Sequence, residues 1–564
     1  MMRKLLVLAV LGLVALGNSS VSVAATLVVD DDGMASATDC NATTPAFPTI
    51  SLAVMAASPG DTIKVCPGLY AEQVFIGTNA SSVVLNNLTL LGAQAGVDAR
   101  TRPFVPDQTT QSIIDHPCGP VQIAANNVTL DGFTVQGSTL PDPCFLSGIW
   151  MNPGSHGPDK GGAQILNNIV QLNISGIELD STCDANPTLV QFNLIQNNSN
   201  PGPGSGNGIQ TNFGLCNATI DSNKFSGHTN SSVLVLGPPV SGVASRINVT
   251  NNELVAGTPE GISFLAVSTA TISGNVSAGS TNVFGTIDLF GGNSDVMVTS
   301  NTLLNGNRAI VVDNPFSGFG IPPNSHITAH QNCIKGNSVG MEVDPLAYAP
   351  TQLLNAENNW WGSSSGPFNV MHNATGTGDA VVDPDDNVDF DPWLTSPPGS
   401  PCPAAPNTPG KGTGGGKIVS PSDSLSLDTV LELATLLINS SSNPASVGGQ
   451  ATFGFSVTCC SPKGNLEYND HNAKIQIKAT SVTTFVISPS TVCIMGKHAQ
   501  FKGMATQSGT PGSVMFTVDV DDCGEPGSST AGGMDTFSIS TTATPPYSAL
   551  GPLIGGNIQI RPAQ

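Results

Sequence analysis

The sequence predicts an all-β protein, in which a right-handed parallel β-helix of about 10–11 coils is followed by a small β-sandwich domain. Three observations carry this prediction. An asparagine-centred phrase returns every 23–31 residues, a second phrase runs out of phase with it, and aromatic (5%) and charged (10%) residues are scarce. Glycine (62 residues) and proline (42 residues) are abundant, which suits many short strands joined by tight turns and does not suit a helical protein.

The first phrase places one asparagine inside a short β-like run. Its asparagines are Asn168, Asn193, Asn223, Asn252, Asn275, Asn301, Asn332 and Asn358, so the steps are 25, 30, 29, 23, 26, 31 and 26 residues. Because asparagine tolerates left-handed backbone and bonds nearby amides, we interpret it as a turn residue that stacked coils would align in a ladder. Turn chemistry is also our interpretation of the glycosylation sequons at Asn87, Asn127, Asn248 and Asn275.

The second phrase is a small residue, an apolar residue and then alternation, as in 176–180, 261–264, 286–289, 309–313 and 340–344. Each period contains one copy of each phrase, so each coil holds at least two short strands. A period of this length indicates a stacked architecture. The leucine-rich repeat pattern is absent, and propeller blades need about 40 residues or more. A parallel β-helix therefore fits the period best.

The first 25 residues are typical of a secretion signal. Arg3 and Lys4 precede an apolar run from Leu5 to Leu16, and Val23-Ala24-Ala25 offers a cleavage site. Loss of Arg3 and Lys4 moves the formal charge from −22 to −24. Such an acidic surface excludes nucleic acid and anionic lipid as partners, and no later stretch is apolar enough for membrane insertion. We expect a secreted protein, extracellular or periplasmic.

The cysteine content fits an oxidising compartment. The chain has twelve cysteines and no C-x-x-C pair, so zinc-ribbon and thioredoxin chemistry are disfavoured. Proximity in the sequence favours the pairs Cys40–Cys66, Cys118–Cys144 and Cys183–Cys216, although connectivity does not follow from sequence.

Residues 26–398 resemble the secreted right-handed β-helix proteins of the pectin-lyase-like superfamily. The resemblance rests on the opening segments 47–50, 56–63 and 65–72 and on the closing segment Asn358-Asn359-Trp360-Trp361-Gly362 with 388–394. It implies that a short amphipathic helix caps the first coil. Bulky tryptophans would cover the last coil, which otherwise exposes an open core. The motifs of the galacturonan hydrolases are absent, so the resemblance fixes fold far better than activity.

Composition changes after residue 398. Residues 399–422 are rich in Pro, Gly, Ser and Thr, which predicts a linker. From 423 to 564, alternating runs such as 451–457 and 514–518 predict the β-sandwich. The phrases 464–471 and 555–560 resemble the post-COAP type of bacterial C-terminal domain, for which no activity is implied.

The second phrase also predicts where acidic residues meet. If Ile177, Ile262, Ile287, Ile310 and Met341 point inward, their neighbours form two outward columns. One column contains Asp288 and Glu342, and the other contains Asp313 and Asp344. Because coils stack about 4.8 Å apart, Asp313, Glu342 and Asp344 would be neighbours, and they are the candidate catalytic residues if the chain is an enzyme, although the sequence leans against catalysis. Arg308, Lys335 and Asp288 are the candidate substrate-binding residues beside them, and residues 315–325 could wall a groove.

Paired carboxylates at this spacing can perform acid–base work on a glycosidic bond, share one proton, or hold Ca²⁺ at Asp313 and Asp344. A solvated acidic edge is the structural alternative. No other cofactor is implied.

We expect a β-helix that presents a flat face to a polysaccharide or cell-surface glycan. The alternatives are a polysaccharide lyase or glycoside hydrolase and a purely structural stalk. Residues 26–398 hold 8 Lys and Arg against 30 Asp and Glu, which favours a neutral glycan over a polyuronate.

Overall fold

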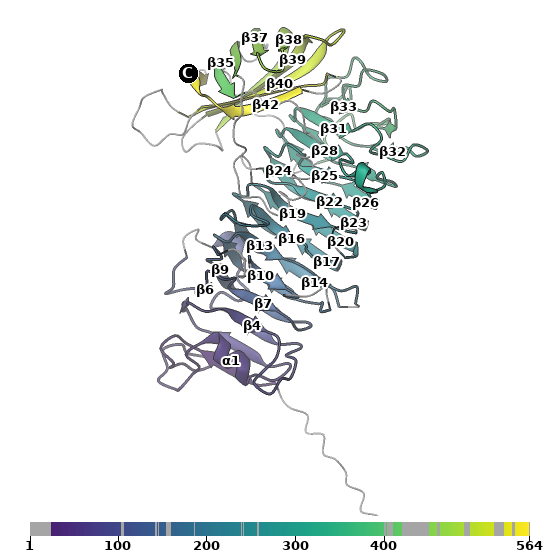
Figure 1. The fold of residues 1–564 in the computed structure, drawn as a ribbon. Coiled ribbons are helices and arrows are strands. Elements are labelled where there is room, and N and C mark those ends of the chain that lie inside the picture. The colour runs from purple at the N-terminus through teal and green to yellow at the C-terminus, as the bar shows by residue number, and fades with distance from the viewer. Residues whose placement is uncertain are drawn as a thin grey trace, which may run out of the picture.

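The computed structural model is a single stacked column of parallel strands, with a separate antiparallel sheet lying across its C-terminal end (Figure 1). It describes residues 24–102, 106–140, 144, 146–153, 159–184, 186–238, 240, 242–255, 259–399, 402, 410–419, 450–458, 463–489, 497–523, 535–543 and 547–562. The predicted signal peptide lies outside the described residues except for its last two positions. The parallel β-helix is confirmed, and its coils carry three strands, in keeping with the prediction of at least two.

The three sheets of the column follow one another around each coil. Sheet 1 contains β1 (Thr26–Val29), β2 (Thr62–Val65), β5 (Thr89–Leu91), β8 (Thr129–Asp131), β11 (Gln164–Leu166), β14 (Thr188–Gln191), β17 (Leu215–Asp221), β20 (Ala244–Thr250), β23 (Ser268–Ser273), β26 (Ser294–Thr299), β29 (Thr328–His330), β32 (Leu354–Asn355) and β34 (Val388–Asp389).

Sheet 2 contains β3 (Gly68–Tyr70), β6 (Ser112–Asp115), β9 (Phe133–Gln136), β12 (Ile169–Gln171), β15 (Leu194–Gln196), β18 (Lys224–Ser226), β21 (Glu253–Leu254), β24 (Val276–Ala278), β27 (Thr302–Leu304) and β30 (Cys333–Lys335). Sheet 3 contains β4 (Val74–Ile76), β7 (Val121–Ile123), β10 (Ser147–Met151), β13 (Ser175–Glu178), β16 (Asn207–Gln210), β19 (Ser231–Leu236), β22 (Ile262–Leu265), β25 (Ile287–Leu289), β28 (Arg308–Val312), β31 (Val339–Val343) and β33 (Val381–Val382).

The core is a stack of aliphatic side chains from all three sheets. In sheet 3, Ile177 pairs with Ile209, Ile287 with Ile310, and Ile310 with Met341, all buried and pointing inward as the sequence predicts. One coil could not bury such a row alone, so each coil depends on its neighbours.

Both ends of the column are covered. Helix α1 (Ile50–Ala56) closes the N-terminal end, with Thr49 as its N-cap and Glu72 accepting the N–H groups of Ile50 and Ser51. At the other end Trp361 is fully buried in the core. Two single 3₁₀ turns, η1 (Ala99–Thr101) and η2 (Ser317–Phe319), lie in connections between strands.

A ladder of buried asparagines runs along the column, as predicted. The backbone N–H of Asn193 donates to Oδ1 of Asn223 (3.0 Å), and its Nδ2 donates to the carbonyl of Ile165 (2.9 Å). The same contact joins Asn168, Asn193, Asn223, Asn252, Asn275, Asn301, Asn332 and Asn359 in turn.

Two details of the ladder differ from the prediction. Its last member is Asn359, whereas Asn358 precedes it. The left-handed position is not the ladder asparagine but the residue before it, with φ between 53° and 66° at 167, 192, 222, 251, 274, 300, 331 and 358. The ladder residue can therefore direct its amide inward, where it satisfies backbone groups of both adjacent coils.

Four disulfides lie along the column. Three join the predicted pairs Cys40–Cys66, Cys118–Cys144 and Cys183–Cys216. The fourth, Cys333–Cys402, spans 69 residues and fastens the chain that leaves the column to β30, a pair that sequence proximity missed. Disulfides in this number are typical of proteins that fold outside the reducing cytoplasm. Within the described residues, no helix has the length and hydropathy needed to cross a bilayer.

The C-terminal domain is a nine-stranded antiparallel sheet. It contains β35 (Gly410–Val419), β36 (Gln450–Thr458), β37 (Lys463–Asp470), β38 (Ile475–Pro489), β39 (Lys497–Gln507), β40 (Val514–Asp522), β41 (Thr536–Thr541), β42 (Tyr547–Pro552) and β43 (Gly555–Pro562). Instead of the predicted two-sheet sandwich, one curled sheet encloses the core, because β36 to β42 form an unbroken meander and β43 returns to β35. Strands of a two-sheet sandwich and strands of one curled sheet both bury alternate residues, so the alternating sequence pattern could not distinguish the two arrangements.

The predicted linker over 399–422 is wrong for residues 410–419, which form β35 inside this sheet. Its glycines are at 410, 412, 414, 415 and 416. A Cβ on Gly412 would lie 3.2 Å from the Phe485 ring, and one on Gly414 would lie 2.5 Å from the Phe455 ring. Glycine thus makes room for aromatic rings packed on the strand. The glycine-rich composition of this segment instead predicts a flexible linker.

The ladder generates a stability prediction. The Asn275 amide bonds the N–H of Asn252 (3.0 Å) and the carbonyl of Val249 (2.9 Å). Asn275→Ala would leave both of these buried backbone groups without a hydrogen-bond partner. We expect a loss of about 2–4 kcal/mol in the free energy of unfolding, measured by chemical denaturation. The control Asn248→Ala alters an exposed sequon asparagine and should change it by less than about 0.5 kcal/mol. Equal effects of the two substitutions would contradict a structural role for the ladder.

Candidate functional site

The two predicted outward columns of sheet 3 exist in the predicted register. Asp288 pairs with Val311, and Val311 with Glu342. Backbone pairing continues one residue past β28 and β31, since Asp313 N–H donates to Leu289 O (3.2 Å) and Asp344 N–H donates to Val312 O (2.9 Å). Asp313 and Asp344 are therefore neighbours on adjacent coils, about 4.8 Å apart along the stack.

The outward face of sheet 3 is not the flat open face that the sequence predicts. Its middle is covered by the insert after β28, where Phe316 and Ile321 pack on Leu265 and Phe290. Connections between sheets 2 and 3 fold over other parts, as where the backbone at Gly204 touches the side chain of Gln210. The long connections supply apolar residues for this cover, so the face is largely buried. Residues 315–325, predicted to wall a groove, instead lie on this apolar cover.

Sheet 1 instead carries an extended polar face. One column on it contains Thr219, Asn248 and Thr271, in direct register. These side chains are half-buried or exposed, and no buried unpaired group lies among them within the described residues. The face is therefore broad, but its described residues form no preformed binding site.

The Asp313 cluster, which we define as Asp288, Arg308, Asp313, Glu342 and Asp344, lies beyond the apolar cover. Arg308 Nε lies 3.1 Å from Glu342 Oε2, with the two side chains 27% and 2% exposed. The cluster has four carboxyl groups and one guanidinium, so it cannot be fully ionised without strong repulsion.

Burial raises the pKa of every carboxyl group in the cluster. It raises the pKa of Asp313 to about 8, with the charge of Asp344 adding to the effect and Arg308 opposing it. Burial, then Asp313, also raises the pKa of Asp288 well above its usual range. The pKa values of Glu342 and Asp344 are raised by burial and lowered in part by Arg308. Asp313, with its pKa near 8, therefore holds its proton for most of the time at neutral pH.

Two carboxyl oxygens of the cluster, Asp288 Oδ1 and Asp313 Oδ1, are buried without a hydrogen-bond donor among the described residues. Glu342 Oε2 also lacks a well-aligned hydrogen bond, but the Arg308 guanidinium 3.1 Å away compensates its charge. A buried polar atom without a partner costs about 1–3 kcal/mol, so the two aspartate oxygens indicate a position that a ligand or ordered solvent completes.

Lys335 does not join this cluster. It lies on β30 in sheet 2, pairs with Leu304, and its pKa is lowered by burial and raised in part by Asp379. Sequence proximity to β31 misplaced it, because the turn between the two strands carries the chain to another sheet.

The C-terminal domain contributes a wall that sequence reasoning missed. A cavity of about 260 Å³ lies between the column and the antiparallel sheet, lined by Arg308 and Glu342 on one side and by residues of β41 and β42 on the other. Arg308 and Glu342 therefore belong to the Asp313 cluster and also face the second domain.

The far end of the same columns holds a second acidic pair, Glu178 and Asp180. Burial, then Asp180, raises the pKa of Glu178 to about 8, and burial raises the pKa of Asp180 to about 6. Asn212 Nδ2 donates to Glu178 Oε1 (2.5 Å), and the backbone of Asn212 donates to Asp180 Oδ1 (2.9 Å). These carboxyl groups have partners within the fold, which indicates a structural role.

His228 and Glu260 form another buried pair that the sequence analysis did not identify. The ring Nδ1 of His228 lies 3.0 Å from Glu260 Oε2, and both side chains are fully buried. His228 Nε2 lies 3.4 Å from Asn198 Nδ2, at the end of a second, shorter ladder that joins Asn173 to Asn198. The pair closes this ladder rather than forming an accessible site.

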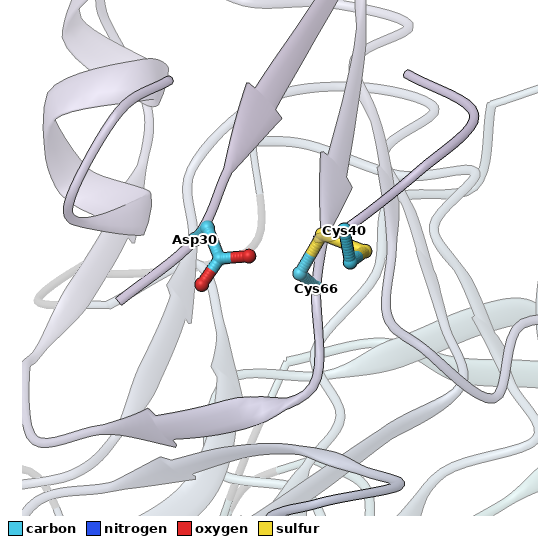
Figure 2. A group of neighbouring side chains, drawn as sticks. All are labelled: Asp30, Cys40 and Cys66. Atoms are coloured by element: carbon cyan, nitrogen blue, oxygen red, sulfur yellow. A yellow bond between two sulfur atoms is a disulfide. The ribbon is translucent and has the colours of Figure 1, made fainter. Parts of the chain in front are cut away.

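A metal site needs ligand atoms that converge on one point. Among the described residues, Asp30, Cys40 and Cys66 are the three groups whose ligand atoms all lie within 4.8 Å of one another. Figure 2 shows that the two cysteines form a disulfide, so their sulfur atoms are not available to an ion. The carboxylates of the Asp313 cluster are the hard oxygen ligands that Ca²⁺ prefers, but no three of them converge in this way.

No family model matches the chain, and no curated protein matches it. Solved structures similar to it include pectate lyase Pel9A (11% identity, 73% of this chain and 85% of that chain, TM-score 0.37) and the alginate lyase of Paenibacillus sp. str. FPU-7 (16%, 60% and 95%, TM-score 0.27). Another is the tailspike protein gp49 of Acinetobacter baumannii bacteriophage Fri1, a capsular polysaccharide depolymerase (11%, 81% and 80%, TM-score 0.28). These similarities concern the fold alone.

The raised pKa of Glu178 predicts a pH-dependent stability. Between its ordinary value of 4.5 and about 8, the folded state holds a proton that the unfolded state releases, so stability falls as pH rises through this range. Glu178→Gln stays neutral, so its free energy of unfolding should gain on that of the wild type from pH 5 to pH 8, by about 2 kcal/mol or more at the upper end, and its Tm should rise relative to that of the wild type in parallel. Glu467→Gln, on an exposed strand position, is the control. Parallel Tm profiles for wild type and Glu178→Gln would contradict the assignment.

Proposed function

We propose that this chain binds a neutral glycan at the Asp313 cluster. The observation that carries the proposal is the pair of buried carboxyl oxygens Asp288 Oδ1 and Asp313 Oδ1, which have no donor among the described residues and belong to the same cluster as Arg308 and Glu342, which line a cavity. Sugar hydroxyl groups are neutral donors, so they can bond these oxygens without adding charge to a crowded acidic site.

The charge balance selects among glycans. With 30 acidic and 8 basic residues over 26–398, a polyuronate would meet a repulsive surface. A polysaccharide lyase acting on uronates is therefore disfavoured. Export through the N-terminal signal, to the periplasm or beyond, would bring the protein to such glycans and is consistent with its disulfides.

Glycoside hydrolysis is a second candidate, favoured by the unequal environments of Asp313 and Asp344. A glycosidase needs one carboxyl group that holds a proton as general acid and another that is ionised. Asp313, with its pKa near 8, fits the acid, and the less buried Asp344 fits the base or nucleophile. Arg308, whose Nε lies 3.1 Å from Glu342 Oε2, opposes the rise that burial causes in the pKa of Glu342.

The binding prediction uses Asp344→Asn, because Asp344 is the least buried carboxyl of the cluster and its substitution should spare folding. We expect at least a tenfold loss of affinity, measured by calorimetry with the neutral oligosaccharide that the wild type binds best in a panel of glucans, mannans, galactans and xylans. Asp295→Asn, on exposed Asp295 of sheet 1, should bind like the wild type.

Absence of binding by the wild type to every member of the panel would remove the proposed function. Repeating the titration with added Ca²⁺ and with a chelator tests the predicted calcium site at Asp313 and Asp344, which should alter affinity if an ion bridges the sugar.

The hydrolysis candidate predicts release of reducing ends that disappears in Asp313→Asn and declines above pH 8, as Asp313 loses its proton. Colorimetric assay of reducing ends over pH 5–9 measures both. Binding with no turnover at any pH would leave recognition alone, and turnover unchanged in Asp313→Asn would show that Asp313 is not the acid.

A further inference from the structure

The cavity between the two domains has walls of different chemistry. The column contributes the charged pair Arg308 and Glu342 together with Asn307 and Ser338. The antiparallel sheet contributes hydroxyl groups, among them Ser538 and Ser540 on β41 and Ser548 on β42. In β41 and β42 the outward positions Ser540 and Ser548 pair directly across the two strands.

The two walls are held together by a buried contact between the domains. Lys502 of β39 donates from Nζ to Asp379 Oδ1 (2.8 Å) and to the carbonyl of Asn337, with the Lys502 and Asp379 side chains only 10% and 6% exposed. Asp379 also accepts the N–H of Gly336 (3.0 Å) and that of Asn337 (2.8 Å). A buried lysine needs this carboxylate, because removal of either partner leaves an uncompensated charge. The contact fixes the position of β41 and β42 relative to β28 and β31.

Each wall offers a polar group to the cavity. On the column, Glu342 Oε2 has the Arg308 guanidinium 3.1 Å away but no well-aligned hydrogen bond, and on β41 Ser540 Oγ is buried without a hydrogen bond among the described residues. The nearby Thr541 hydroxyl, in contrast, donates to Gln507 Oε1 (2.6 Å). The Glu342 carboxylate on one wall and the Ser540 hydroxyl on the other therefore suit a ligand that can both donate and accept hydrogen bonds.

The size and rim of the cavity restrict this ligand. Its volume of about 260 Å³ lies just below the range of about 300–1,000 Å³ typical of pockets for drug-sized ligands, so it admits one ring rather than an extended chain. Val283 and Leu550, both about half exposed, lie at the apolar part of the lining. A ring with hydroxyl groups at its edge and C–H groups on its face matches these walls.

We propose that the interdomain cavity binds one sugar unit of a neutral glycan, with Glu342 and Arg308 contacting its hydroxyl groups from the column and Ser540 contacting them from the C-terminal domain. This inference rests on the proposed function and extends it, since the C-terminal domain becomes part of the binding site rather than a separate module. Glu342 then links the cavity to Asp313 and Asp344, so one glycan would span both.

The test uses the full chain with Ser540→Phe, which fills the cavity, and Ser540→Ala, which removes only the hydroxyl. The probe is each linear gluco-, manno-, galacto- and xylo-oligosaccharide of one to six units, titrated by calorimetry. We expect the best-bound series to lose at least tenfold in affinity with Ser540→Phe and about three- to tenfold with Ser540→Ala. Ser456→Phe, an equivalent outward position on β36 away from the cavity, should bind like the wild type.

The outcomes separate the two proposals. Wild-type affinity in both Ser540 variants, together with loss in Asp344→Asn, would overturn the interdomain site and leave the proposed function standing. Absence of wild-type binding to all four series would overturn both. If Ser540→Phe unfolds, as judged by its Tm, Ser540→Ala decides the question alone.

Discussion

The structure depends on the register between successive coils. Each coil pairs strand for strand with the next, and the buried asparagine ladder fixes that register by using one amide to satisfy backbone groups above and below it. A slip of one residue would turn every inward isoleucine outward and break the ladder at the same time. The aliphatic stack supplies the favourable burial, while the ladder selects one alignment among the many that such a stack would accept.

The same register creates the acidic site. Asp288, Asp313 and Asp344 belong to three different coils and are distant in the sequence, yet they become neighbours because their strands are stacked. Close stacking also buries them, and burial is the first cause of the raised pKa of Asp313. A rigid column can hold such unfavourable groups together because the cost is spread over many stabilising coils. The C-terminal domain adds a cavity that Arg308 and Glu342 of the same cluster line.

Much of this was predictable from the sequence, for identifiable reasons. The repeat period and the inward isoleucines predict the column, and the outward columns place Asp313 beside Asp344. The predictions that failed depended on how segments distant in the sequence pack together in space. Lys335 lies near β31 in sequence but on another sheet, and the glycines of β35 resemble a linker because composition does not show which rings pack on them. The cover over sheet 3 and the wall from β41 and β42 arise from contacts between segments with no shared pattern, so no local signal reports them. The His228–Glu260 pair was missed because neither residue lies in a repeated phrase.

The proximity of Asp313 and Asp344 that stacking creates can be tested without any ligand. Titration of the side-chain carboxyl carbons by ¹³C NMR, with selectively labelled aspartate, should show Asp313 with a pKa near 8 and a lower value in Asp344→Asn, because a neighbouring negative charge has been removed. A pKa for Asp313 close to its ordinary 3.8, unchanged by that substitution, would show that the two residues do not share a buried site.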